Sequence, residues 1–225
     1  MLSFAEEIYL LALDEDRGKI MPDARNPVLG TAVVAAILVE LAFLNKITTD
    51  KDHIYILDTK STKSPVLNDV LKSFKTSEKK IAKIKRVLKA LMSHAKTLEK
   101  MVLSELIKKG ILKEVDDKIL WIFPNRHYPL IDNKEIVNVE TRIRRLILSN
   151  DEVAPKDAAL ISLLQASKLF KKILSEEECI HYRERIEQLT EMSDIGKNAE
   201  DLIYKIRDLP DNPYSDLLTE EDTIV

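Results

Sequence analysis

The chain has 225 residues, of which 45% are hydrophobic and 32% charged, enough for one core of ordinary size. Aromatic residues make up only 5% and glycines number four, which argues against β-sandwiches and β-barrels, because strands and turns use both types. A single cysteine, Cys179, excludes an intramolecular disulfide and a cysteine-rich metal site. No basic region precedes an apolar run at the N-terminus, so we expect no signal peptide and a cytoplasmic protein.

The net charge of −3 is distributed unevenly along the chain. Between Lys72 and Lys113, thirteen Lys and Arg residues stand against three acids, a local balance of +10 that leaves −13 for the remainder. Such a basic segment in an acidic chain indicates a surface for an anionic partner. A solvated helix face that only keeps the protein soluble would give the same pattern, so both interpretations stay open.

The first 47 residues predict a helix, a polar turn and a second helix. Ser3 and Glu6 form an S-x-x-E capping box ahead of apolar residues at helical spacing, and the polar turn ends at Gly18. Val28–Leu44 is apolar nearly all round, but it has only 17 residues with Glu40 inside, whereas a membrane span needs ~20 with few charges. We therefore predict a central core helix, in which Glu40 requires a buried partner or a place at the helix end.

The remaining elements follow from periodicity and turn signals. The middle of the chain predicts a strand, a short helix, a basic amphipathic helix, a longer helix ending at Gly110, and a β-hairpin, over 53–58, 66–74, 81–91, 96–109 and 111–123. Four more helices are expected at about 135–149, 156–173, 176–191 and 195–208. Residues 209–225 are acidic, contain no base and are expected to be disordered.

The predicted fold is mostly α: a single compact helical domain over residues 1–208, built around the central apolar helix, with small β-hairpin insertions. No catalytic pattern accompanies it. The four histidines are scattered, the glycines are isolated and no G-x-S-x-G sequence occurs, so we expect neither enzyme activity nor a metal or cofactor.

Helix 96–109 followed by the hairpin resembles half of a winged helix, which raises nucleic acid as a third possible partner. The basic segment is rich in Lys, with Arg86 its only Arg, and Lys suits diffuse anionic surfaces better than bidentate base reading. Nucleic acid is therefore disfavoured. Trp121, within the hairpin, is interpreted as packing a strand on the helices rather than as an interfacial anchor.

Several segments resemble the Golgi phosphoprotein 3 family. The first is A-E-E-I-Y-L-L-A-L-D-x-x-x-G-K-I over residues 5–20, and V-x-x-A-I-L-V-E-L-A-F-L-N-K-I follows over residues 33–47. Further matches occur in the family's order at residues 65–71, 106–112, 128–130 and 159–167. The resemblance covers about residues 2–207, and because it starts so early we expect a minimal member of prokaryotic type.

The resemblance implies a mostly helical domain that binds membranes peripherally. Eukaryotic members recognise phosphatidylinositol 4-phosphate at the cytosolic face of the Golgi and link the tails of membrane enzymes to vesicle coats. The family's headgroup positions fall here at Arg25, Val34, Lys96 and Glu99. Val34 and Glu99 remove two basic donors, so the resemblance supports binding of anionic lipid more firmly than it supports phosphoinositide specificity.

The predicted sites combine the resemblance with the basic segment. The expected anion-binding residues are Arg25, Lys96, Lys89 and Lys100. The expected membrane contacts are Lys83, Lys85, Arg86, Leu88, Leu91 and Met92, in the region before Lys96 where the family's apolar, bilayer-entering hairpin is expected. The partners are an anionic membrane surface or phosphoinositide headgroup, with cytosolic tails of membrane enzymes and self-association as further possibilities. The alternative function is a protein-interaction scaffold that binds such tails without lipid.

Overall fold

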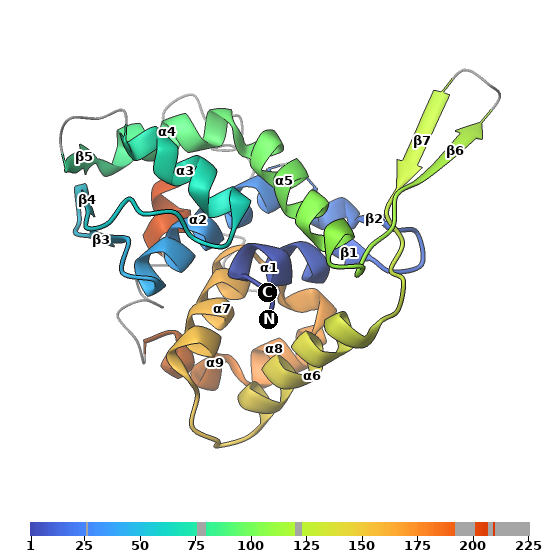
Figure 1. Cartoon of the computed structure of the whole chain (residues 1–225). Coiled ribbons are helices and arrows are strands. Elements are labelled where there is room, and N and C mark those ends of the chain that lie inside the picture. Colours follow the sequence, from blue (N-terminus) through green and yellow to red (C-terminus); the bar gives the residue numbers. More distant parts are fainter. Residues whose placement is uncertain (26, 76–79, 120–122, 192–200, 207–208, 210–225) are drawn as a thin grey trace.

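The apolar segment forms α2 (Val28–Phe43), the helix around which the others pack in the computed structural model (Figure 1). The structure describes residues 1–25, 27–75, 80–119, 123–191, 201–206 and 209. Buried residues occur on every side of α2, from Leu29 to Leu41, which confirms the prediction of a core helix. In this described part of the chain, no helix is long and apolar enough to cross a membrane.

Helix α1 (Phe4–Leu11) packs against α2 and starts at the predicted capping box. The Ser3 hydroxyl accepts from the backbone N–H of Glu6 at 3.3 Å, and the Glu6 carboxylate accepts from the N–H of Ser3 at 2.7 Å. Glu40 has the buried partner that its position required, because its Oε2 accepts the N–H of Phe4 at 2.7 Å. This bond fixes the start of α1 to the end of α2.

Three helices cover one side of α2 and form the upper part of Figure 1. They are α3 (Pro65–Lys75), α4 (Ile84–Ser93) and α5 (Ala95–Lys108). The helix predicted over 81–91 begins three residues later in the structure, at Ile84, because residues 81–83 form a strand.

In the described residues, the strands pair in three small antiparallel sheets. These are β1 (Leu13–Asp14) with β2 (Lys19–Ile20), β3 (Ile47–Thr49) with β4 (His53–Ile56) and β5 (Ile81–Lys83), and β6 (Val115–Ile119) with β7 (Phe123–His127). The hairpin was predicted over 111–123, but in the structure it begins and ends four residues later, at Val115 and His127. The reason is that Ile111 completes the end of α5, its N–H donating to the carbonyl of Leu106 at 3.0 Å after Gly110 turns with φ +69°.

The C-terminal helices cover the other side of α1 and α2, in the lower part of Figure 1. They are α6 (Lys134–Leu148), α7 (Pro155–Ala166), α8 (Glu176–His181) and α9 (Arg183–Glu191), with a short 3₁₀ turn, η2 (Leu169–Lys172), between α7 and α8. Another 3₁₀ turn, η1 (Pro22–Ala24), precedes α2. The helix predicted over 156–173 ends at Ala166, because Lys168 takes a left-handed φ of 57°. Residues 201–206 are helical, and the predicted tail after Leu209 lies outside the described residues.

Candidate functional site

The exposed side of α4 and α5 is basic. Its exposed charged residues are six cations and no acid: Lys85, Arg86, Lys89, Lys96, Lys100 and Lys108. The acids of α5, Glu99 and Glu105, are only partly exposed. We call these six residues the α4–α5 basic face. Helical periodicity explains it, because Ile84, Val87, Leu88 and Leu91 turn the opposite side of α4 to the core.

The residues predicted to contact a membrane divide between the surface and the core. Lys83, Lys85 and Arg86 are exposed, Lys83 at the end of β5 and the other two on α4. Leu88 and Leu91 are 0% and 6% exposed and belong to the hydrophobic core, and Met92 packs partly against it. Only the charged members of this predicted set, and part of Met92, therefore reach the surface.

Arg25 and Lys96 are both exposed. Arg25 follows η1, and its Nε donates to the carbonyl of Ile20 at 3.2 Å. Lys96 lies in the first turn of α5 near Glu99. Lys89 and Lys100 are exposed on α4 and α5, so three of the four predicted anion-binding residues belong to the α4–α5 basic face.

The other two headgroup positions bring no cation. Val34 is 0% exposed in the middle of α2, so its side chain is covered by the core. Burial raises the pKa of Glu99, an effect that the neighbouring Lys96 ammonium opposes. The Glu99 Oε1 atom is buried, without a hydrogen-bond partner in the described structure, and its charge also helps to raise the pKa of Tyr9, after burial as the main cause. Neither position therefore contributes a basic donor to a phosphate group.

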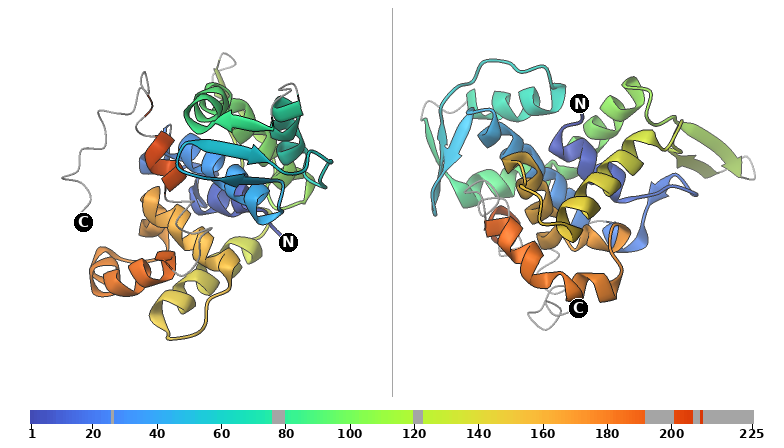
Figure 2. Two further views of the ribbon diagram at one scale, coloured as in Figure 1. Left: turned by 90° about the vertical axis from the view of Figure 1, so that its left-hand side faces the viewer. Right: turned by 90° about the horizontal axis from the view of Figure 1, so that it is seen from below.

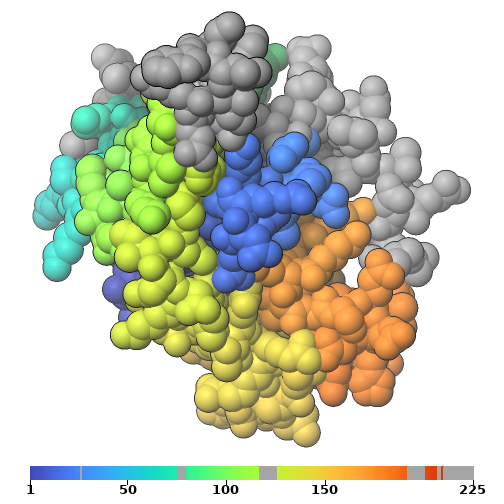
Figure 3. Space-filling view, turned by 90° about the vertical axis from the view of Figure 1, so that its right-hand side faces the viewer, coloured from blue at the N-terminus to red at the C-terminus, as the bar shows by residue number. Residues whose placement is uncertain are grey.

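Strands β6 and β7 form a hairpin that stands away from the helices (Figure 1). It follows α5, and so comes after Lys96 in the chain. The turn sequence Leu120-Trp121-Ile122 is apolar, but residues 120–122, including the predicted packing of Trp121, lie outside the described residues. Figure 3 shows the base of the hairpin against the blue β1–β2 turn, where the N–H of Tyr128 donates to the carbonyl of Gly18 at 2.6 Å.

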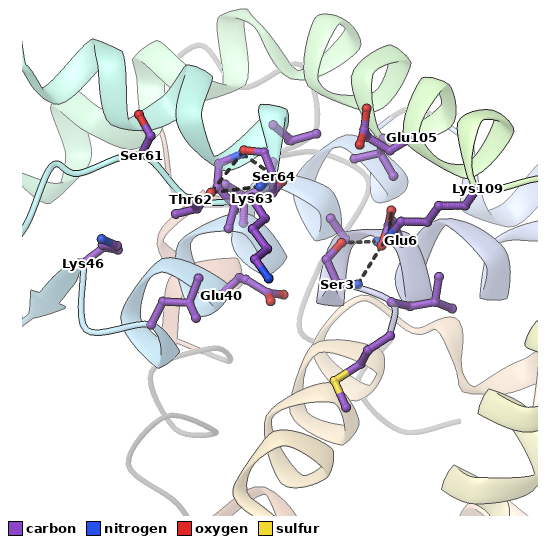
Figure 4. A pocket seen from close by; sticks show the side chains of 18 of the residues that line it. Ser3, Glu6, Glu40, Lys46, Ser61, Thr62, Lys63, Ser64, Glu105 and Lys109 are labelled. Carbon is purple, nitrogen blue, oxygen red and sulfur yellow. Dashed lines mark hydrogen bonds and ion pairs between the residues drawn. The ribbon is translucent and has the colours of Figure 1, made fainter.

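A cavity of about 580 Å³ opens where α1 begins, α2 and α5 end, and α3 begins (Figure 4). Apolar side chains line it, including Leu2, Ile37, Val66, Leu67 and Val102. At its rim, Lys63 belongs to a loop that three hydrogen bonds between Thr62 and Asn68 hold in place, at 2.6, 3.0 and 3.0 Å. The cavity can therefore accept a partly apolar group, but no histidine or cysteine lines it.

Buried carboxylates next to this cavity are matched by cations from distant segments. Lys109 lies 2.6 Å from the Glu6 carboxylate, and Arg142 Nη2 lies 2.9 Å from Glu7 Oε2. Burial raises the pKa of Glu40, while its bond from the N–H of Phe4 opposes that shift. These partners indicate that the acids stabilise the fold.

The described residues offer few other sites. In the described ranges, no group of three or more His, Cys, Asp or Glu residues could hold a metal ion. Burial raises the pKa of the Cys179 thiol, and nearby Glu178 adds to the shift, which disfavours the reactive thiolate.

Two comparisons bear on the identity of the chain. A family model described as Golgi phosphoprotein 3 (GPP34) matches residues 4–206, in agreement with the motifs of the sequence. No curated protein sequence matches the chain.

Proposed function

Because the chain belongs to the Golgi phosphoprotein 3 family, which is associated with membranes or lipids in general, we propose that it docks reversibly on anionic membranes. The observation that supports this function best is the α4–α5 basic face, with its six exposed cations and no exposed acid. Each basic residue near an anionic leaflet contributes about 1 kcal/mol, so a few of them suffice for reversible binding. The protein would act without catalysis, as a cytoplasmic, peripherally associated module.

The β6–β7 hairpin has a position that suits the same orientation. Figures 1 and 2 show it rising past α5 on the side of the molecule where α4 and α5 lie. A membrane facing the α4–α5 basic face would then also lie close to these strands, between which the sequence carries the apolar residues Leu120-Trp121-Ile122. Aromatic residues favour the interface between headgroups and acyl chains. We propose that the hairpin adds an apolar contact to the electrostatic one.

The lipid headgroup that the protein prefers is a separate question from membrane binding itself. The family resemblance implies phosphatidylinositol 4-phosphate, but Val34 is buried and Glu99 adds a negative charge near Lys96. Lysines act as point charges without the bidentate geometry that arginine offers to phosphate. We therefore propose selection by surface charge, with no preference for phosphatidylinositol 4-phosphate over other anionic lipids at equal charge.

Vesicle co-sedimentation tests the function. Vesicles of neutral lipid, of phosphatidylserine mixtures and of phosphatidylinositol 4-phosphate at equal total charge are compared with the wild-type chain. The variant Lys85→Gln/Arg86→Gln/Lys89→Gln should lose about 3 kcal/mol of binding to anionic vesicles, roughly a hundredfold in affinity. The control Lys134→Gln/Lys171→Gln/Arg183→Gln removes the same charge from exposed positions on the α6–α9 side and should bind nearly as the wild type does.

Equal binding of the wild type to neutral and anionic vesicles, or no binding to either, would exclude the proposed function. A strong preference for phosphatidylinositol 4-phosphate at matched charge would overturn only the proposal about headgroups.

A second candidate function is an adaptor for the cytosolic tails of membrane enzymes, and the cavity in Figure 4 is the observation that favours it. Its apolar lining and polar rim would suit a short peptide segment. Recovery of a membrane enzyme on the immobilised chain, together with absent vesicle binding, would favour the adaptor. A steeply salt-dependent affinity for duplex DNA, above that for anionic vesicles, would instead favour nucleic acid.

A further inference from the structure

We infer that the α4–α5 basic face also binds an acidic segment of this same chain, residues 210–225, in competition with the membrane. The segment contains Asp211, Asp216, Glu220, Glu221 and Asp222 and no Lys or Arg. The competition with lipid rests on the proposed function, whereas the docking of the segment on the protein does not.

Charge complementarity is the first argument. The α4–α5 basic face concentrates cations, while the remainder of the chain is acidic in sum. Lys85, Arg86 and Lys100 make no ion pair with any residue in the described part of the protein. Opposite charge at these positions would lower the repulsion among the clustered cations. Five acids within twelve residues supply such a charge.

Residues 210–225 are long enough to extend from the end of the described chain to the α4–α5 basic face. The described chain ends at Leu209, which is 6% exposed and whose N–H donates to the carbonyl of Ile206 at 3.3 Å, so the segment starts from a point fixed to the core. Sixteen residues can extend about 50 Å. A compact domain of this length has a radius of gyration of about 17 Å, so the α4–α5 basic face lies within the span.

Tethering is the third argument, because it makes a weak contact effective. A surface ion pair contributes at most about 1 kcal/mol and is screened by salt. A short tether, however, holds the segment at an effective concentration of about 1 mM, so that a dissociation constant of roughly 0.1–0.5 mM suffices for substantial occupancy. An anionic membrane, with many more charges, would displace the segment.

Paramagnetic relaxation without any lipid tests the docking. A nitroxide is attached to Ser215→Cys in a Cys179→Ser background, which removes the chain's one native thiol. We expect the backbone amide signals of α4 and the first half of α5 to broaden more than those of α6 and α9. The broadening should disappear in 0.5 M salt and in the variant Asp211→Asn/Asp216→Asn/Glu220→Gln/Glu221→Gln/Asp222→Asn.

Even broadening over the whole surface, broadening centred elsewhere, or broadening that survives the neutralised variant would overturn the inference. Labelled and isotopically enriched chains are also mixed as separate molecules. Broadening that appears equally in that mixture would assign the contact to a second copy and would likewise overturn it.

Vesicle binding then measures the competition. The neutralised variant should bind anionic vesicles about three- to tenfold more tightly than the wild type, the range set by an effective concentration near 1 mM. Removing acids also lessens direct repulsion from the membrane, so the relaxation measurement decides whether docking occurs. Docking without vesicle binding by any variant would contradict the proposed function alone, whereas vesicle binding without docking would contradict this inference alone.

Discussion

Gly18 joins the β1–β2 turn to the base of the β6–β7 hairpin. Its φ of +59° disfavours any side chain, and a Cβ at this position would lie 2.6 Å from the backbone nitrogen of Pro129. Gly18→Ala therefore introduces backbone strain. It also places the new methyl group against backbone atoms, which cannot rotate away as a flexible side chain can. We expect a loss of about 2–4 kcal/mol in the free energy of unfolding, measured by urea denaturation.

Gly110 offers a matched control for that substitution. Its φ is +69°, but a Cβ there would meet nothing within 4 Å. Gly110→Ala should cost only the backbone strain, about 1–2 kcal/mol. Equal losses in the two variants would show that the contact between Gly18 and Pro129 does not constrain the hairpin.

The burial of single acidic residues could not be predicted from the sequence. Glu6 and Glu7 read as ordinary acids at a helix start, where the helix dipole or water explains them. The structure buries them at 3% and 2% exposure and pairs them with Lys109 and Arg142. Those partners lie more than 100 residues away in the chain, so local patterns carry no sign of them. The capping box, in contrast, involves residues three apart and was predicted correctly.

Helix α4 has a buried apolar side and an exposed basic side, so the two can be tested separately. Leu88 is 0% exposed in the core, whereas Lys85 and Arg86 are exposed on the opposite side. Leu88→Ala should cost about 2–5 kcal/mol in unfolding free energy. The folded fraction of this variant should still bind anionic vesicles as the wild type does.

Lys85→Gln/Arg86→Gln should show the reverse pattern, with an unchanged urea midpoint and weaker vesicle binding. The two variants are compared by denaturation and by co-sedimentation at a temperature where both are folded. Loss of vesicle binding by folded Leu88→Ala would instead support the original expectation that this leucine contacts the membrane.

Element boundaries were predictable where one local signal dominates. The helix at 96–109 was predicted almost to the residue, because Gly110 ends it with a positive φ. The position of the following hairpin was predicted wrongly, because Ile111 and Leu112 have the residue types of a strand. In the structure, Ile111 completes the end of α5, and Leu112 forms an isolated β-bridge with Leu130. The three-stranded sheet was missed because β5 pairs with β4 across 25 or more residues of intervening chain.

At the scale of the whole molecule, the sequence predicted the helical fold through its long apolar helix. It did not predict on which side of the molecule the basic residues and the hairpin would lie. The α4–α5 basic face was visible as a run of charge, yet its separation from Leu88 and Leu91 depends on which side of α4 meets the core. The direction in which the hairpin projects from the helices is likewise seen only in the folded chain (Figure 1). Both features depend on tertiary packing, and the proposed membrane orientation rests on them.

Trp121 makes that orientation measurable, because it is the chain's only tryptophan and lies between β6 and β7 in the sequence. If the α4–α5 basic face and the hairpin meet the bilayer together, anionic vesicles should shift the tryptophan emission to shorter wavelength, since indole would leave water for the interface. Neutral vesicles should leave it unchanged. Lys85→Gln/Arg86→Gln/Lys89→Gln should need more lipid to reach the same final shift. Unchanged emission under conditions where the chain co-sediments would show that it binds with the hairpin away from the bilayer.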